Sequence, residues 1–296
     1  MPLLLTGEPG TGKTQLASVV AHDLGIFPPL KFETKSTSQS KDLFYTYDAL
    51  TAFKMKDATD PRTFIHYQAL GRAILEAFPA DDPRIAALLP PDQPGAWRHP
   101  GAPRRSVVLI DEIDKAPRDF PNDLLNEIER LSFRVPELSN AATPGANGGD
   151  AGPPTRFRPI VIITSNSEKG LPDPFLRRCV YYDIPFPKAE AMRDIVAARI
   201  KPLGKGSTML KDALDLFYSL RREQGARLNK QPSTAELLNW LQVLLHRGVR
   251  PEDSLRAQPD LVRETASALI KNAADRDKAF AGVDAWADGR TSQGKG

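Results

Sequence analysis

Short apolar segments alternate with stretches of helical periodicity along the first part of the chain. Five segments predict β-strands, at 3–5, 30–34, 107–110, 160–163 and 180–184. The second alternates apolar and polar side chains, whereas most of the others are almost continuously apolar, as in strands covered by helices on both faces. Helical spacing of apolar residues is found over 16–24, and over 124–131 after Pro117. The alternation predicts an α/β fold with a doubly wound, five-stranded parallel sheet.

Two stretches interrupt this alternation. Residues 57–105 contain many prolines around one helical pattern, 64–78, and predict an insert over the core whose second half is extended. Residues 139–155 carry almost no large apolar side chain and predict a flexible loop, which either faces a ring pore or serves as a spacer.

Beyond residue 187 the pattern is helical throughout. Four amphipathic patterns, at 192–196, 209–220, 237–245 and 261–270, predict a small all-helical domain. We therefore expect an αβα core over 1–187 and a helical domain over 188–287. The polar, glycine-rich residues 288–296 predict a disordered tail.

Composition narrows the function classes. The chain has 296 residues, of which 41% are hydrophobic and 26% charged, as in folded proteins with a sizeable core. The net charge of only +3 does not favour a nucleic-acid partner. No window predicts a signal peptide or a membrane span. The single cysteine, Cys179, excludes an internal disulfide and leaves no zinc cluster, so we expect a cytoplasmic protein.

A glycine-rich segment lies between the first predicted strand and the first helix, the context that a phosphate-binding loop requires. It consists of Gly7, Glu8, Pro9, Gly10, Thr11, Gly12, Lys13 and Thr14, followed by Gln15. Backbone N–H groups of such a loop converge on phosphates at the positive end of the following helix. Lys13 is expected to reach the β- and γ-phosphates, and the Thr14 hydroxyl to ligate Mg²⁺.

Two further strands end in polar residues at the same predicted edge of the sheet. Asp111 ends an apolar strand and is expected beside the magnesium, and Glu112 can polarise a water for in-line attack on the γ-phosphate. Asn166 follows the next apolar strand and is a candidate to orient that water. Arg177 and Arg178 end a short helix, and one of them is expected to stabilise charge at a neighbouring subunit's γ-phosphate.

These elements, in this order and with a helical domain behind them, resemble the AAA+ ATPases. The segments 4–14, 108–116 and 171–179 and the long insert resemble the MoxR-like group more narrowly. The resemblance implies a five-stranded core with a helical lid, and ATP bound with Mg²⁺ between protomers of a ring, a hexamer in that family. It also implies a client protein that is remodelled or activated, with a partner that carries a von Willebrand factor A domain.

The chain departs from relatives in two places. No arginine begins the third helix of the predicted lid, where Ser233 and Glu236 predict a capping box, and Arg227 or Lys230 is the available replacement. The chain also opens directly at the first strand, so either the natural start lies upstream or contacts to the adenine base are few. After the second strand, Thr34 or Ser36 either restrains Glu112 or is an ordinary turn residue.

The sequence thus predicts an ATP-hydrolysing, ring-forming machine. Two alternatives stay open: a nucleotide-gated assembly scaffold with negligible hydrolysis, and an ATP-dependent nucleic-acid motor. The modest charge opposes the motor, and the missing lid arginine favours the scaffold. The preference for adenine follows from the resemblance alone.

Overall fold

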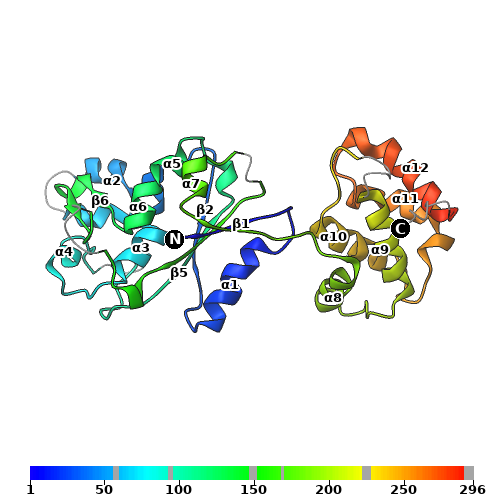
Figure 1. The fold of residues 1–296 in the computed structure, drawn as a ribbon, viewed down its shortest axis with the longest axis horizontal. Coiled ribbons are helices and arrows are strands. Elements are labelled where there is room, and N and C mark those ends of the chain that lie inside the picture. The colour runs from blue at the N-terminus through cyan, green and yellow to red at the C-terminus, as the bar shows by residue number, and fades with distance from the viewer. Residues whose placement is uncertain (56–59, 93–95, 147–151, 168–169, 222–227, 290–296) are drawn as a thin grey trace. The chain divides into compact units, whose positions relative to one another are not determined.

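A computed structural model of the chain describes residues 1–55, 60–92, 96–146, 152–167, 170–221 and 228–289 (Figure 1). Contacts between residues divide the chain into two compact units. The first contains Met1–Gly7 and Gly12–Ile184, and the second contains Glu8–Thr11 and Pro185–Gly296.

The first unit is built on a five-stranded parallel sheet in the order β2-β5-β8-β1-β9. Its strands are β1 (Leu3–Thr6), β2 (Leu30–Glu33), β5 (Val107–Asp111), β8 (Ile160–Thr164) and β9 (Val180–Asp183). All five predicted strands are present, and the predicted fold class is confirmed.

Burial along each strand follows its place in the sheet. β5 is buried at every residue because strands flank it on both sides and helices cover both of its faces. β2 lies at one edge, and only its alternate residues are partly buried, as its alternating sequence predicts. β9 is almost continuously apolar, yet it is exposed along its length, since it forms the other edge.

Helices cover the two faces of the sheet with separate clusters of buried side chains. On one face α1 (Lys13–Asp23) contacts β5 and β8 over a small cluster that includes Leu5, Ala17 and Leu109. On the other face α3 (Ala69–Leu75) contacts β2 and β5 within a much larger cluster. The sheet therefore lies between helices on both faces, and α1 begins just beyond the carboxyl end of β1 (Figure 1).

The predicted helix over 64–78 is wrong in its first turn. Residues Ile65–Tyr67 form β4, which pairs antiparallel with β3 (Tyr45–Tyr47), and the helix α3 begins only at Ala69. The β3–β4 pair begins directly after Phe44, whose backbone lies against α3. A Cβ atom on Gly71 of α3 would lie 1.9 Å from the Phe44 carbonyl oxygen. α3 packs on β2 and β5, so this part of the predicted insert over 57–105 belongs to the core of the first unit. Two short helices, α2 (Ala49–Lys54) and α4 (Pro83–Ala86), flank it.

The predicted helix over 124–131 is interrupted and begins before its apolar pattern. It starts as α5 (Phe120–Asp123), three residues after Pro117, and continues after Leu124 as α6 (Leu125–Arg130). Leu131 ends α6 in a left-handed conformation with φ of 52°. The short helix α7 (Asp173–Leu176) lies in the same unit.

Part of the segment 139–155, predicted as a flexible loop, forms regular structure where the chain is described. β6 (Arg134–Val135) pairs with β7 (Ala141–Ala142) in a hairpin, and the Thr143 hydroxyl accepts a hydrogen bond from the Phe133 N–H at 2.9 Å. Thr143, Pro144 and Gly145 are buried, so small side chains here serve close packing. Residues 147–151 lie outside the described residues.

The second unit is helical. It contains α8 (Ala189–Arg199), α9 (Thr208–Arg221), α10 (Thr234–His246), α11 (Pro259–Thr265) and α12 (Arg276–Ala287). One cluster of buried side chains joins them and includes Trp240 on α10 and Trp286 on α12. The four predicted patterns correspond to α8 to α11, whereas α12 was not predicted as a helix, although Ala279, Val283 and Trp286 have helical spacing.

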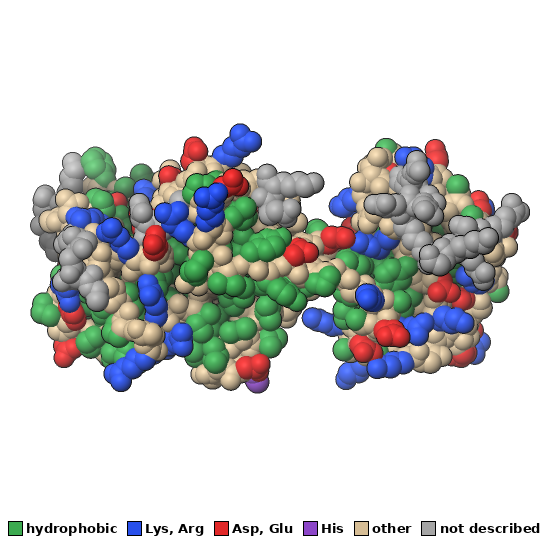
Figure 2. All heavy atoms as spheres, in the orientation of Figure 1, with side chains coloured by type: hydrophobic (Ala, Val, Ile, Leu, Met, Phe, Trp, Pro, Cys, Tyr) green, Lys and Arg blue, Asp and Glu red, His purple; other side chains and the backbone are tan. Residues whose placement is uncertain are grey.

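The surface carries mixed charge on the face drawn in Figure 2, where lysine and arginine side chains alternate with aspartate and glutamate. Among the described residues, no helix combines the length and the apolar character that a membrane span requires. Of the predicted tail, residues 290–296 lie outside the described part of the chain.

Candidate nucleotide site

The predicted phosphate-binding loop joins β1 to α1. Gly10 and Gly12 have φ of 84° and 92°, a backbone conformation that residues with a Cβ atom rarely adopt. Gly12 directly precedes the first residue of α1, Lys13, whose ammonium donates to the Gly7 carbonyl at 2.8 Å. Burial lowers the pKa of Lys13, and the neighbouring carboxylates, Asp114 foremost, act in the opposite direction. The loop thus encloses a lysine at a helix N-terminus, which is an arrangement that binds phosphate.

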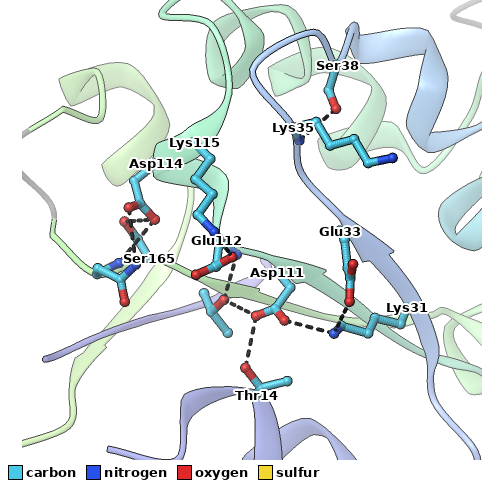
Figure 3. A network of polar contacts seen from close by, with 12 residues as sticks. Thr14, Lys31, Glu33, Lys35, Ser38, Asp111, Glu112, Asp114, Lys115 and Ser165 are labelled. Atoms are coloured by element: carbon cyan, nitrogen blue, oxygen red, sulfur yellow. Dashed lines mark hydrogen bonds and ion pairs between the residues drawn. The ribbon is translucent and has the colours of Figure 1, made fainter. Parts of the chain in front are cut away.

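Asp111 lies at the centre of the polar network at the carboxyl ends of the strands (Figure 3). Its Oδ1 atom accepts hydrogen bonds from Thr14 at 3.0 Å and from Thr164 at 2.7 Å. Burial raises the pKa of Asp111, but hydrogen bonds from Thr164, Lys31 and Thr14 outweigh it and keep the pKa below its ordinary value. An ionised carboxylate beside the Thr14 hydroxyl is an oxygen donor set of the kind that Mg²⁺ prefers. These two residues therefore fit the metal that the sequence predicts.

Glu112 follows Asp111 in a left-handed conformation with φ of 58°. Its backbone N–H donates to the Thr164 hydroxyl at 2.9 Å, and its side chain forms an ion pair with Lys115. Neither Thr34 nor Ser36 makes a hydrogen bond to Glu112 among the described residues, as is usual for ordinary turn residues. The Thr34 N–H donates to the Asp111 carbonyl at 3.1 Å and its buried hydroxyl has no partner among the described residues, while Ser36 is exposed.

Asn166 lies in the turn after β8, beside the residues that follow β5. Its backbone N–H and its side-chain amide both donate to Asp114, at 3.1 and 3.3 Å. The Ser165 hydroxyl donates to the same carboxylate at 3.1 Å. Asp114 thus fixes the turn that carries Asn166.

Arg177 and Arg178 lie away from these residues. They end α7 just before β9, whose first residue, Val180, pairs with Leu3 at the start of β1. This is the amino end of the strands, whereas the phosphate loop follows the carboxyl end of β1. Both arginines line a cavity of about 390 Å³ with buried apolar residues such as Phe175.

The two arginines differ in their contacts. The Arg178 guanidinium donates to Glu129 at 3.3 Å and to the Pro174 carbonyl at 3.2 Å. Arg177 is exposed, and its side chain has no polar partner among the described residues. Arg177 is therefore the arginine of the pair that is available to another molecule.

Residues 2–179, more than half of the chain, match the family described as AAA domain (dynein-related subfamily). The chain belongs to this AAA family. AAA proteins in general bind ATP with Mg²⁺, hydrolyse it and commonly assemble into rings. All the site residues predicted from the sequence lie within the matched part of this AAA chain.

A solved structure of a RuvB mutant from Thermotoga maritima is similar to this AAA chain, with 15% sequence identity and a TM-score of 0.46. The similarity covers 93% of the AAA chain and 64% of the RuvB chain, so this chain spans less than two thirds of that protein. A search of curated proteins finds no match.

Sequence reasoning did not assign roles to several residues of this network, namely Lys31, Asp114, Lys115 and Thr164. Asp114 and Lys115 follow Glu112 within one turn, so their position after the acidic pair was the available signal. Lys31 and Thr164 belong to the strands on either side of β5, and only the order of strands in the sheet brings them to Asp111.

In the second unit, the capping box at α10 is confirmed, with the Ser233 N–H donating to Glu236 at 2.6 Å. Of the candidates for the missing lid arginine, Lys230 lies 4.0 Å from Glu236, and Arg227 lies outside the described residues.

Proposed function

We propose that this chain is an ATP-hydrolysing, ring-forming AAA+ ATPase with a core over 1–187 and a lid over 188–287. The observation that carries the proposal is the convergence of Thr14 and Asp111, 3.0 Å apart, directly behind a phosphate-binding loop. Magnesium bound there supplies positive charge to the β- and γ-phosphates of ATP. In this assignment Lys13 and the residues Gly7 to Gln15 bind the nucleotide.

The remaining residues act on water and on a neighbouring subunit. Glu112 is half-exposed beside Asp111, and takes a proton from the water that attacks the γ-phosphate. Asn166 positions that water, supported by its fixed place beside Asp114. Arg177 stabilises the charge that develops on a neighbour's γ-phosphate, supported by its exposure and its distance from the chain's own loop.

The experiment compares ATP binding, phosphate release and particle size by light scattering, with and without Mg²⁺. We expect the wild type to assemble and release phosphate, Glu112→Gln to keep ATP in an assembled state, and Lys13→Ala to lose binding. Lys35→Ala removes a lysine side chain of the same unit that makes no contact with Asp111 or Glu112, while the backbone hydrogen bond of Lys35 to Ser38 is kept, and is expected to behave as the wild type. Equal phosphate release by the wild type and Glu112→Gln would contradict the role of Glu112.

The MoxR-like assignment is supported by the motifs at 4–14, 108–116 and 171–179. It extends the proposal to a hexameric ring in the cytoplasm and to remodelling or activation of a client protein, with a von Willebrand factor A domain protein as partner. Capture of such a partner by ATP-bound Glu112→Gln, but not by Lys13→Ala, is the expected result. Identical capture by both variants would contradict nucleotide-dependent partnership.

The second candidate is a nucleotide-gated scaffold with negligible hydrolysis. The ion pair of Glu112 with Lys115 favours it, because a carboxylate that contacts an ammonium is not free to contact the attacking water. ATP-dependent assembly without phosphate release, in both the wild type and Lys115→Ala, would support the scaffold over the enzyme.

A further inference from the structure

A lysine outside the phosphate-binding loop, Lys31, contacts the carboxylate of Asp111, which is assigned to magnesium. The Lys31 ammonium lies 3.1 Å from Asp111 Oδ2 and 2.6 Å from Glu33 Oε1 (Figure 3). Lys31 and Glu33 both lie on the edge strand β2, whereas Asp111 ends the neighbouring strand β5. The ammonium therefore bridges carboxylates from two strands.

Strand register explains this arrangement. Glu33 and Asp111 are paired across β2 and β5, so their carboxylates lie on the same face of the sheet and repel each other. Lys31, two residues before Glu33, lies on that face as well. A cation between the two carboxylates removes the repulsion, and the apolar residues of β2, Leu30 and Phe32, alternate onto the opposite face, where they pack against the larger core.

The contacts of Asp111 divide between its two oxygens. Oδ1 accepts from the hydroxyls of Thr14 and Thr164, and Oδ2 faces Lys31. An ammonium and a divalent cation at one carboxylate repel each other strongly at distances of a few ångströms. Lys31 also has an alternative partner, since Glu33 is largely exposed and lies on the same strand.

We propose that Lys31 is a tethered counter-ion of Asp111 that gives up Asp111 and keeps only its contact with Glu33 when Mg²⁺ binds with nucleotide, and that it thereby sets the magnesium affinity of the site. This inference rests on the proposed nucleotide site. Lys31 opposes the metal and does not help to hold it, so its removal strengthens metal binding. A residue that merely supported the fold would not change metal affinity in that direction.

The test measures the affinity of the full chain for ADP with and without Mn²⁺ by calorimetry, and counts bound Mn²⁺ by electron paramagnetic resonance. The ratio of the two ADP affinities is the coupling between metal and nucleotide. In Lys31→Met we expect this coupling to rise about fivefold or more. Lys31→Gln provides a second neutral variant, and Lys31→Arg, which keeps the charge, should stay close to the wild type.

Lys35→Met is the matched control. Lys35 lies two residues after the end of β2 and carries the same charge as Lys31, but its side chain points away from Asp111 (Figure 3). An equal rise in Lys35→Met and Lys31→Met would show a general effect of charge and would overturn the proposal, as would an unchanged or reduced coupling in both neutral Lys31 variants. If the wild type binds no ADP, both the proposed function and the role of Lys31 are overturned. If ADP binding depends on the metal and Lys31→Met leaves that dependence unchanged, only the role of Lys31 as a counter-ion is overturned.

Discussion

Thr164 links the two acidic residues that the proposed chemistry uses. Its hydroxyl donates to Asp111 Oδ1 and accepts from the backbone N–H of Glu112, at 2.7 and 2.9 Å. The side chain is fully buried at the end of β8, so water cannot replace either hydrogen bond. One hydroxyl thus fixes the position of Asp111 and the backbone from which Glu112 projects.

Thr164→Val keeps the shape of the side chain and removes both hydrogen bonds. The free energy of unfolding should fall by about 1–3 kcal/mol, because the Glu112 N–H is left buried without an acceptor. Affinity for ADP with Mg²⁺ should fall as well, since Asp111 loses one of the donors that hold it. Urea unfolding and calorimetry measure the two effects.

Thr143→Val is the control for that substitution. Thr143 is also buried, and its hydroxyl accepts from the Phe133 N–H, but it lies in the β6–β7 hairpin. We expect a similar loss of stability with unchanged ADP affinity. Equal ADP affinity in the two valine variants would show that Thr164 supports only the fold.

The thiol of Cys179 should react slowly in the native protein. Burial raises its pKa from 9.0 to about 11, so the reactive thiolate is scarce at pH 8. Because the folded pKa is the higher one, this group adds stability below pH 9 that is lost as the pH rises towards 11. Labelling by iodoacetamide at pH 8 should be much slower in the native chain than in urea, and equal rates would contradict the burial of the thiol.

At the scale of elements, the sequence predicts correctly those strands, helices and loops that depend on residues close together in the chain. The five strands and the phosphate-binding loop are contiguous segments, and their apolar runs and glycines suffice to locate them. The first turn of the predicted helix over 64–78 fails for the opposite reason. Ile65–Tyr67 pairs with Tyr45–Tyr47, about twenty residues away, and nothing local distinguishes that strand from a helical turn.

The residues of the candidate site also fall into two groups, those that local sequence predicts and those that only the order of strands brings together. Lys13, Thr14 and Asp111 were predicted because phosphate and magnesium chemistry requires those residue types at those places in a strand–loop–helix unit. Lys31 and Thr164 reach Asp111 through the sheet order β2-β5-β8, which apolar periodicity does not specify. Motifs thus located the centre of the network, and tertiary structure supplied its neighbours.

Glu76 joins α3 to the extended segment that follows it. The carboxylate is fully buried and accepts hydrogen bonds from Trp97 at 3.1 Å, Arg104 at 2.9 Å and Ser106 at 3.0 Å. Glu76→Ala leaves the buried Ser106 hydroxyl and the Trp97 N–H without their acceptor, whereas the half-exposed Arg104 guanidinium can turn to water, so the free energy of unfolding should fall by about 1–3 kcal/mol. Chemical denaturation of the full chain measures this loss.

Asp92→Ala tests whether burial, and not charge alone, causes that effect. Asp92 pairs with Arg98 at 3.2 Å in the same extended segment, but both side chains are largely exposed. Exposed pairs contribute about 0–1 kcal/mol, so this variant should remain close to the wild type. Similar losses in the two variants would contradict the special role of Glu76.

At the scale of the whole molecule, the proposed site is divided between two copies of the chain. The phosphate loop and Asp111 lie at the carboxyl ends of the strands, and Arg177 lies before the amino end of β9. An arginine at the amino end of the strands is far from the loop of its own sheet, and in the proposed head-to-tail ring it would reach the loop of the next copy. Arg178 is held by Glu129, so its substitution should have the smaller effect.

Mixing two inactive variants tests this division directly. Arg177→Ala should lose about a thousandfold or more in phosphate release, because the developing charge is no longer stabilised, and Lys13→Ala should be inactive through loss of binding. In an equal mixture, the intact loop of one variant meets the intact arginine of the other at about a quarter of the interfaces if the copies assemble at random. Phosphate release should therefore reappear in the mixture, in proportion to that fraction. If light scattering shows that the two variants assemble together and the mixture stays inactive, Arg177 does not act on a neighbouring copy.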